Sequence, residues 1–501
     1  MTDSSQPRPV KRVVIAGGGT AGWMAAAALS RTLGKVLDIT LVESEEIGTV
    51  GVGEATIPTL VTFHRLLDID EQAFMAATGA TIKLGIQFEG WREPGQDYIH
   101  SFGTTGKDHW TAGFQHFWMK GRQRGLARDY GDYCLELRAA QEQRFAHLAR
   151  NGMNYAFHLD AGLYARFLRR FSEGFGARRI EGRIATVQTS AQGDIAALVM
   201  EDGTRVEGDL FIDCTGFRAL LLGRTLGVAF QDWSHWLFAD SALAVQTESV
   251  APPVPYTRSM AGPAGWQWRI PLQHRVGNGI VYSSRFMDQE AARAALLDNL
   301  EGPPLFEPRP LRFTPGQRQV TWKRNCVALG LASGFLEPLE STNIHLVSRN
   351  LTRLLQSFPH VIRQVDIDEY NAQTEAEMVH IRDFVILHYH VTRRRDTPFW
   401  HACAQMDIPA TLRHRIDLFA QTGRVFHVPN ELFAENSWIQ VMLGQGIAPA
   451  QYHPVADLMD DAELARFLDG IHQQVEQTVA RLPPHADYLR SYCAQPRPAM
   501  A

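Results

Sequence analysis

Glu340 lies directly before a predicted helix start, in the segment 333–346. Pro338, the Ser-Thr-Asn cluster at 341–343 and apolar residues that recur at helical spacing predict this helix. The preceding apolar run, Cys326–Leu331, predicts a buried strand. A helix that starts after such a strand directs its unpaired N–H groups at whatever lies above the sheet, and these groups attract anions. The pattern indicates an anion site beside a carboxylate, although an ordinary capped helix would share it.

A second set of chemically informative residues lies near the N-terminus. Lys11–Ala16 predicts a short parallel strand that runs into an Ala-rich helix. The turn between them fits G-x-G-x-x-G at Gly17, Gly19 and Gly22, which permits a tight turn, a close approach of a pyrophosphate and close helix packing. A second predicted strand, Asp38–Glu43, ends in an acid at the spacing that ribose recognition requires. These residues predict dinucleotide binding, with a solvated strand end as the alternative for the acid.

Two further segments could contact a ligand. The glycine-rich stretch Gly48–Pro58 disfavours regular structure and predicts a loop against a ligand, or else a flexible linker. Lys83 lies in the largely uncharged stretch Thr78–Trp91. Its ammonium either extends to water or occupies a desolvated site as a hydrogen-bond donor or tuned amine. Aromatic residues gather downstream at 100–118 and line either the core or an aromatic-ligand pocket.

Hydrophobic periodicity predicts the elements that position these residues. Leu135–Phe171 is predicted to be helical, with Asp160 capping its last part. Short strands are predicted between 179 and 212, separated by polar turns. More strands are predicted from about 225 to 325, and long amphipathic helices follow at 366–391 and 460–481.

Two residue pairs with a spacing of two lead to different conclusions. Trp266 and Trp268 lie in a predicted strand, where such residues share a face, so they would stand side by side as an indole wall or as part of the core. His388 and His390 lie in a predicted helix, where the same spacing turns them in different directions. We therefore expect no metal site.

Composition excludes several classes of function. The formal net charge is -5, so no basic surface argues for nucleic acid. The five cysteines include no Cys-x-x-Cys pair, which fits a reducing compartment and neither a disulfide framework nor a zinc site. No apolar run approaches the roughly 20 residues that span a bilayer, and the N-terminus lacks the apolar core of a signal peptide. We expect a cytoplasmic protein without membrane contact.

Three features together predict the fold class: the dinucleotide fingerprint, a strand that returns to it at 208–217, and the strand–loop–helix at 326–345. They predict an α/β protein with the glutathione-reductase-type FAD-binding fold, an additional β-sheet and a mainly α-helical C-terminal subdomain. The expected parts are residues 1–345, with the FAD box and a substrate-facing sheet, and residues 346–501. Because we find no second fingerprint for a nicotinamide cofactor, we expect FAD to arrive reduced, by diffusion from a separate flavin reductase.

The sequence resembles the flavin-dependent halogenases of the tryptophan halogenase family. The matching motifs are Gly17-Gly-Gly-Thr-Ala-Gly-Trp23, Gly51-Val-Gly-Glu-Ala-Thr56, Lys83, Trp266-Gln-Trp-Arg-Ile-Pro271, Gly330-Leu-Ala-Ser-Gly-Phe-Leu-Glu-Pro-Leu-Glu-Ser-Thr342 and, in the helical part, Asp396-Thr-Pro-Phe-Trp400. The W-x-W-x-I-P motif together with the matching lysine is highly specific. The resemblance therefore favours functional roles for Lys83 and the tryptophan pair.

The resemblance implies a reaction. Family members use reduced FAD, O₂ and chloride or bromide to make hypohalous acid, which travels to a separate pocket and halogenates an aromatic ring. By analogy, Lys83 hydrogen-bonds the hypohalous acid or forms a haloamine, and both routes need a dry amine site. Glu340 would orient the oxidant or take the ring proton. The backbone N–H groups of Thr342 and Asn343 would hold the halide.

The resemblance also assigns contacts by position. The residues expected to touch FAD are Gly17, Gly19, Thr20, Ala21, Gly22, Glu43, Ala55, Ile184, Leu331 and Ile344. Residues 51–56 resemble the strap that lies between the flavin and substrate sites. Trp266 and Trp268 would separate the substrate from the flavin and so suppress hydroxylation.

Two departures from the family pattern concern the halide and the substrate. Asn343 stands where the family commonly has Gly, and its side chain could change the halide preference. No tyrosine pair occurs around Phe426–Trp438, where tryptophan-specific members grip the amino-acid group. This argues for an indole or another electron-rich arene, stacked on His100, Phe102 and Trp438, as a substrate at least as plausible as free tryptophan. A homodimer is compatible with the sequence.

Two rival hypotheses share part of this pattern. An FAD aromatic monooxygenase would have the same fold but no use for Lys83 or the tryptophan wall, and Gly330–Gly334 lacks the aspartate that such enzymes usually carry. A non-catalytic flavoprotein needs only the fingerprint, so replacing Lys83 would then change no turnover.

Overall fold

The structure is a computed structural model that describes residues 9–46, 53–109, 111–149 and 152–494. The chain divides into two compact units, each made of three segments. The first unit comprises Met1–Gly79, Leu159–Leu237 and Arg312–Met378, and the second comprises Ala80–His158, Phe238–Leu311 and Val379–Ala501. These limits differ from the division at residue 345, which stays a prediction.

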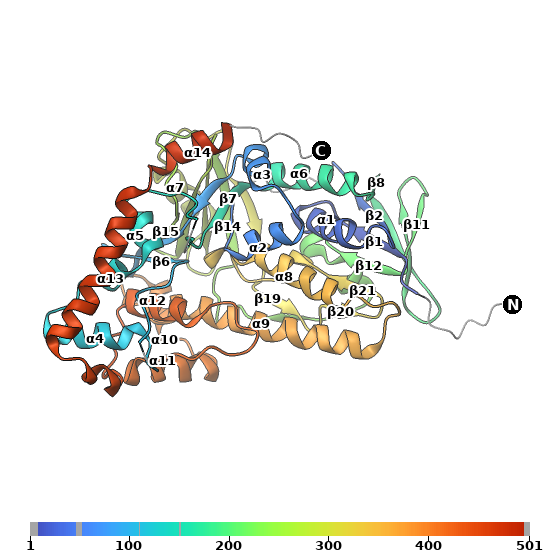
Figure 1. The fold of residues 1–501 in the computed structure, drawn as a ribbon. Coiled ribbons are helices and arrows are strands. Elements are labelled where there is room, and N and C mark those ends of the chain that lie inside the picture. The colour runs from blue at the N-terminus through green and yellow to red at the C-terminus, as the bar shows by residue number, and fades with distance from the viewer. Residues whose placement is uncertain (1–8, 47–52, 110, 150–151, 495–501) are drawn as a thin grey trace. The chain divides into compact units, whose positions relative to one another are not determined.

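A six-stranded sheet in the order β20-β21-β12-β1-β2-β8 carries the first unit (Figure 1). Its strands are β1 (Arg12–Ala16), β2 (Asp38–Glu43), β8 (Arg178–Glu181), β12 (Leu210–Asp213), β20 (Trp322–Lys323) and β21 (Cys326–Ala328). All pairings are parallel except that of β20 with β21. The predicted return of the chain to the side of β1 is confirmed by β12. The run predicted as a strand to Leu331 ends three residues earlier, because Gly330 takes φ +60°.

Helix α1 (Thr20–Leu33) follows β1 and packs against α6 (Ala161–Gly174). Residues 22–30 of α1 are all buried, because a helix that is apolar on every side can be covered completely. The remaining strands of this unit are β3 (Gly53–Ala55), β9 (Ile184–Thr189), β10 (Ile195–Met200), β11 (Arg205–Glu207), β13 (Phe230–Asp232), β19 (Gly316–Arg318) and β22 (Gly334–Phe335). Its other helices are α2 (Thr59–Leu66), α3 (Glu71–Thr78) and α8 (Asn343–Gln356).

The second unit contains a seven-stranded sheet in the order β18-β14-β17-β16-β15-β5-β6. Its strands are β5 (Gly85–Glu93), β6 (Gln96–Ser101), β14 (Ser241–Thr247), β15 (Thr257–Gly262), β16 (Gly265–Pro271), β17 (Val276–Tyr282) and β18 (Arg309–Arg312). Beside it, the short strand β4 (Thr81–Lys83) pairs with β7 (Ala156–Asp160). Its helices are α4 (Phe114–Arg124), α5 (Leu135–Gln141), α7 (Gln289–Asp298), α10 (Pro398–Gln405), α11 (Ala410–Thr422), α12 (Glu435–Gly444), α13 (Asp461–Arg481) and α14 (His485–Ala494).

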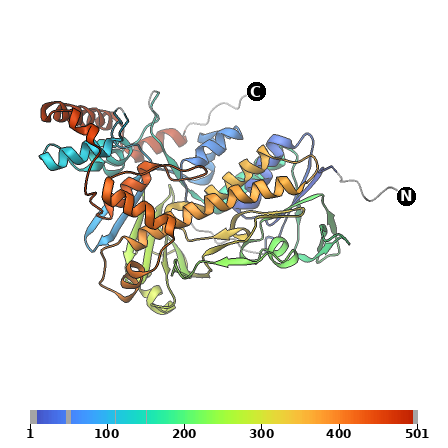
Figure 2. The ribbon, with the colours of Figure 1, turned by 90° about the horizontal axis from the view of Figure 1, so that it is seen from below.

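The C-terminal region is helical, as predicted, and the protein is α/β with mixed sheets. The long helix α9 (Gln364–His390) begins alongside α8 (Figure 2). No helix in the described part of the chain has the length and apolar character to cross a membrane.

The continuous helix predicted over Leu135–Phe171 is wrong. Strand β7 separates α5 from α6, and its first four residues are all buried, so it has no alternating pattern to distinguish it from a buried helix. The predicted cap is confirmed, because the Asp160 carboxylate accepts a hydrogen bond from Leu163 N at 2.9 Å.

Candidate active site

The fingerprint turn leaves an open backbone surface at the carboxyl end of β1. Gly17 has φ +107°, and a Cβ there would lie 2.3 Å from the carbonyl oxygen of Cys214. At Gly19, by contrast, no described atom outside the neighbouring backbone lies within 4 Å of the Cβ position. The first N–H groups of α1 have no partners within the helix. This arrangement fits a pyrophosphate on the backbone of Gly19, Thr20 and Ala21.

Glu43 ends β2 at the same edge, because the carboxyl ends of parallel strands meet there. Its carboxylate accepts hydrogen bonds from Trp23 Nε1 at 3.3 Å and from Arg179 Nε at 2.5 Å. A carboxylate has about four lone-pair sites, so Glu43 retains capacity for a ribose hydroxyl. Arg179 was not predicted from the sequence, although its three acidic partners at 43, 45 and 181 signal the need for a cation.

Two more predicted FAD contacts approach the fingerprint. A Cβ on Gly330 would lie 3.0 Å from Ala21 Cβ, so the turn that carries Leu331 packs on the start of α1. Leu331 is 37% exposed, which is unusual for a large apolar side chain in a packed turn. Ile344 is buried on α8, which contacts the same turn.

The remaining predicted FAD contacts lie outside the fingerprint turn. Ile184 is partly buried and packs against a core cluster that includes Val14, Ala16 and Val42. Ala55 is buried in β3. Residues 51 and 52 of the predicted strap lie outside the described residues.

The turn before α8 has a strained backbone. Glu340 and Ser341 both adopt left-handed conformations, with φ of +62° and +59°, which are uncommon for residues other than glycine. Helix α8 starts at Asn343 with Thr342 as its N-cap, but no side chain caps it. Glu340 and Thr342 are each only 1% exposed. The sequence predicts a carboxylate before a helix start, and the structure adds that the carboxylate is buried and that no side chain caps the helix.

The helix that follows this turn carries a buried hydrogen-bond chain that could not be predicted from the sequence. His345 Nδ1 lies 2.9 Å from Thr59 Oγ1, and His345 Nε2 donates to Glu377 Oε1 at 2.9 Å. Arg353 pairs with the other Glu377 oxygen at 2.5 Å. The hydrogen bond from His345 and the charge of Arg353 keep the pKa of Glu377 below its ordinary value despite burial.

Lys83 is completely buried at the end of β4. Its Nζ lies 5.2 Å from the ring centroid of Phe102, within cation–π range. This burial excludes the alternative in which the ammonium extends to water. The structure thus brings Lys83 and Phe102 close together.

His100 and Trp438 belong to one aromatic cluster in the second unit. The His100 ring lies 5.7 Å from Phe384, and Trp438 lies 4.8 Å from the same ring. Phe433 stacks on Phe384 at 3.8 Å. Trp438 Nε1 donates to the buried Glu431 at 2.8 Å, so its indole is fixed in orientation. Phe384 was not predicted from the sequence, because α9 approaches His100 only in the folded chain.

Trp266 and Trp268 stand side by side on β16, with ring centroids 6.2 Å apart, and this prediction is confirmed. Their exposures are only 2% and 7%. Gly279 faces Trp268 on β17, where a Cβ would lie 2.1 Å from the indole. Arg269 of the same motif points to the other face and binds the backbone carbonyl of Asn299 at 2.6 Å.

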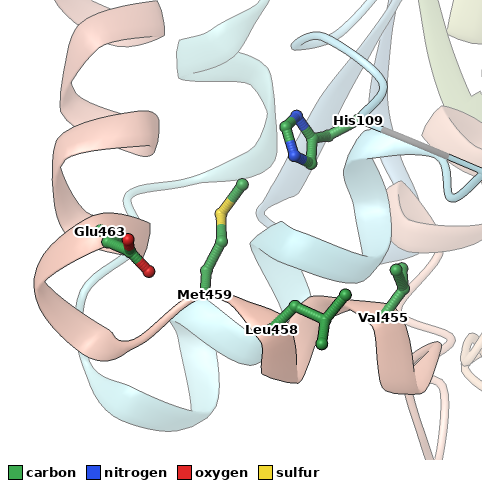
Figure 3. Close-up of a pocket in the computed structure, with 5 residues that line it drawn as sticks. All are labelled: His109, Val455, Leu458, Met459 and Glu463. Carbon is green, nitrogen blue, oxygen red and sulfur yellow. The ribbon is translucent and has the colours of Figure 1, made fainter.

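A separate hollow of about 350 Å³ lies on the helical part of the second unit (Figure 3). His109, Val455, Leu458, Met459 and Glu463 line it, and none of them is a predicted site residue. Within the described ranges, no group of three His, Cys, Asp or Glu could hold a metal ion.

Comparison with known proteins identifies a family and similar structures. The family model described as tryptophan halogenase matches residues 12–461. The chain is 36% identical over 444 residues to tryptophan 7-halogenase RebH of Lentzea aerocolonigenes, covering 84% of this chain and 83% of that protein. The structure of Xcc4156, a flavin-dependent halogenase from Xanthomonas campestris, matches with a TM-score of 0.96 and 73% identity over 98% of this chain and 100% of that chain. BrvH, a flavin-dependent halogenase from Brevundimonas sp. BAL3, matches with a TM-score of 0.93 and 45% identity over 97% of this chain and 100% of that chain.

Proposed function

Because this chain belongs to the tryptophan halogenase family and is a flavin-dependent halogenase, we propose that it halogenates an indole or another electron-rich arene through Lys83 and Glu340. Family membership sets aside the rival hypotheses of an aromatic hydroxylase and of a non-catalytic flavoprotein. The observation that carries the proposal is the complete burial of the Lys83 ammonium against Phe102.

The six-stranded sheet corresponds in this proposal to the glutathione-reductase-type FAD-binding fold. The open backbone at Gly19 and the free N–H groups of α1 would hold the pyrophosphate, and Glu43 would hold the ribose. Held by these residues, reduced FAD from a separate flavin reductase would supply hypohalous acid by reducing O₂ in the presence of halide. The uncapped start of α8 at Thr342 and Asn343 would hold the halide, because its N–H groups favour an anion.

Lys83 acts on the oxidant in the proposed mechanism. An ammonium in a water-excluded site donates a stronger hydrogen bond to a neutral hypohalous acid than it would in water. The electrophilic halogen is then oriented toward the aromatic ring instead of being lost to solvent. A haloamine would serve the same purpose: the deprotonated amine would attack the halogen, the halogen–oxygen bond would break, and hydroxide would leave with the amine proton as water.

Glu340 has the role of proton acceptor. The ring loses a proton as it becomes aromatic again, and a buried carboxylate is a suitable general base. The left-handed backbone at this residue fixes the direction of its side chain. The position of the Glu340 carboxylate therefore depends on the backbone of the turn as well as on the side-chain rotamer.

The aromatic cluster supports a flat arene as substrate. His100, Phe384, Phe433 and Trp438 offer ring faces and edges within 6.3 Å of one another in successive pairs. RebH is named as a tryptophan halogenase, but the segment 426–438 of this chain contains no tyrosine. An arene without an amino-acid group is therefore the substrate class we favour.

The test compares product formation with oxidation of reduced flavin in the Lys83→Ala variant. We expect halogenated product to fall by more than about 100-fold, since a correctly placed group of this kind contributes roughly 10² to 10⁴, while flavin oxidation continues. Lys120→Met is the matched control, because Lys120 is also buried but its Nζ donates to the carbonyls of Ala456 and Met459. Full halogenation by Lys83→Ala would refute the proposal.

Glu340→Gln provides the second arm. Glutamine keeps the Cβ and therefore the backbone strain, so a change in rate reports the carboxylate alone. We expect a loss of roughly 100-fold in product with unchanged release of hypohalous acid. The neighbouring Ser341→Ala variant has the same strained turn without loss of an acid and should retain activity.

A further inference from the structure

Strand β4, which carries Lys83, is hydrogen-bonded through Thr81 to His158, a histidine of defined tautomer. In the ladder between β4 and β7, Thr81 pairs with His158 and Lys83 pairs with Ala156. Residues two apart in a strand share a face, and directly paired residues share it too. Thr81, Lys83, His158 and Ala156 therefore lie on one face, and all four are completely buried.

The hydrogen bonds around His158 determine which nitrogen carries its proton. Thr81 Oγ1 donates its single proton to the carbonyl oxygen of Pro271 at 2.7 Å. It must therefore accept from His158 Nδ1, which lies 3.0 Å away. On the other side of the ring, His158 Nε2 lies 2.9 Å from the hydroxyl of Thr257. A hydroxyl can donate there, so the neutral ring with Nδ1–H satisfies both contacts.

Charge also favours this neutral form. Burial is the main reason that the pKa of His158 lies well below its ordinary value, and the charge of Lys83 and the nearby His485 add to the effect. His485 is likewise fixed, since its Nε2 accepts from Ile82 N at 3.3 Å and its Nδ1 donates to Pro253 O at 2.8 Å. Lys83 is then the only charged side chain among the three residue pairs of this ladder.

We propose that His158 is a positioning residue for Lys83, a neutral imidazole of fixed tautomer that holds β4 in place without competing for the oxidant as a second cation. The inference rests on the proposed role of Lys83. His158 lies on the same face of the ladder as Lys83 and contacts the hydroxyls of Thr81 and Thr257. Loss of its hydrogen bonds would let Lys83 shift, and hypohalous acid would escape before it reacts with the ring.

The experiment measures three quantities in one reaction: reduced flavin consumed, halogenated arene formed, and free hypohalous acid captured by a diffusible trap. In His158→Phe, which keeps a ring but neither nitrogen, we expect product per flavin to fall roughly 10- to 100-fold, because small misplacements of a catalytic group cost this much. Trapped hypohalous acid should rise correspondingly. A general loss of folding would instead lower trapped hypohalous acid and product together, because free reduced flavin reacts with O₂ without forming hypohalous acid.

Two further variants keep the inference falsifiable if His158→Phe fails to fold. Thr257→Val removes only the donor to Nε2, and His158→Asn retains a donor near the position of Nδ1. Both variants should therefore release more trapped hypohalous acid, but the increase should be smaller than in His158→Phe. His116→Asn is the control, since His116 is another buried histidine, on α4, and burial lowers its pKa to about 4. Unchanged product per flavin in the His158 and Thr257 variants would overturn the inference. Retained halogenation in Lys83→Ala would instead overturn the proposed function itself.

Discussion

Two buried histidines in this molecule have opposite electrostatic surroundings. His158, in the second unit, lies between two threonine hydroxyls on the strand pair that carries Lys83. His345, in the first unit, lies between a threonine hydroxyl and the carboxylate of Glu377, two residues after the predicted halide ligand Asn343. In the first region the imidazole contacts neutral hydroxyls beside an ammonium, whereas the second concentrates ionic partners around an imidazole near a helix start.

The difference indicates how each region meets its chemical task. Neutral hydroxyl partners keep His158 uncharged beside the Lys83 ammonium, so this region gains no second cation. A helix start that must hold an anion needs a rigid scaffold, and a network of charged hydrogen bonds supplies rigidity. Histidine serves both regions because its partners determine where its proton lies.

The largest expected effect tests the ionic region. Glu377→Gln would leave Arg353 buried without its carboxylate, and breaking a buried pair in this way costs about 3 to 5 kcal/mol of unfolding free energy. Equilibrium unfolding in denaturant would measure this loss of unfolding free energy. Glu375→Gln is the control, because Glu375 lies on the same helix and is exposed. An unchanged unfolding free energy in Glu377→Gln would show that the ionic network does not stabilise the fold. The proposed difference between the two regions would then be wrong.

A somewhat smaller effect tests the neutrality of the second region through His485. Burial lowers its pKa from the ordinary 6.5 to about 4. Between these values the unfolded chain takes up a proton and the folded chain does not, so stability falls as the pH falls through this window, by about 3 kcal/mol in total. Unfolding midpoints measured from pH 7.5 to 4.5 should therefore decline less steeply in His485→Gln. Equal slopes in the two proteins would contradict a neutral His485.

The smallest effect concerns packing around the tryptophan pair. Gly279→Ala would place a methyl group against the Trp268 indole and should cost about 1 to 3 kcal/mol. In the Trp268→Ala background the same change should cost less, because the indole is absent and only the Leu243 carbonyl oxygen, 2.5 Å from the Cβ position, still opposes the methyl group. Trp268→Ala alone should increase hydroxylated product and peroxide, if the pair shields the substrate from the flavin. Additive stability losses in the double variant would show that the two residues do not interact.

Local sequence signals predicted much of the fold and part of the site. The fingerprint turn, the Asp160 cap and the shared face of Trp266 and Trp268 each depend on neighbouring residues or simple periodicity, and each is present. The burial of Lys83 agrees with its apolar sequence neighbours. These signals act over a few residues, so they can be read without knowledge of the tertiary structure.

The contacts that the sequence did not reveal join distant segments. His158 and Thr81 are 77 positions apart, and no pattern in either segment indicates their hydrogen bond. Strand β7 was missed because it is buried on both faces, so it has no alternation. The left-handed turn at Glu340 was missed as well, since glutamate carries no intrinsic preference for that conformation.

The two consecutive left-handed residues before α8 have a consequence for laboratory evolution. Each such residue other than glycine costs of order 1 to 3 kcal/mol, and glycine at either position would recover much of this energy. Selection for thermal tolerance alone would then reward glycine at 340, which removes the carboxylate. Libraries screened by heat should therefore hold codon 340 constant and let codon 341 vary.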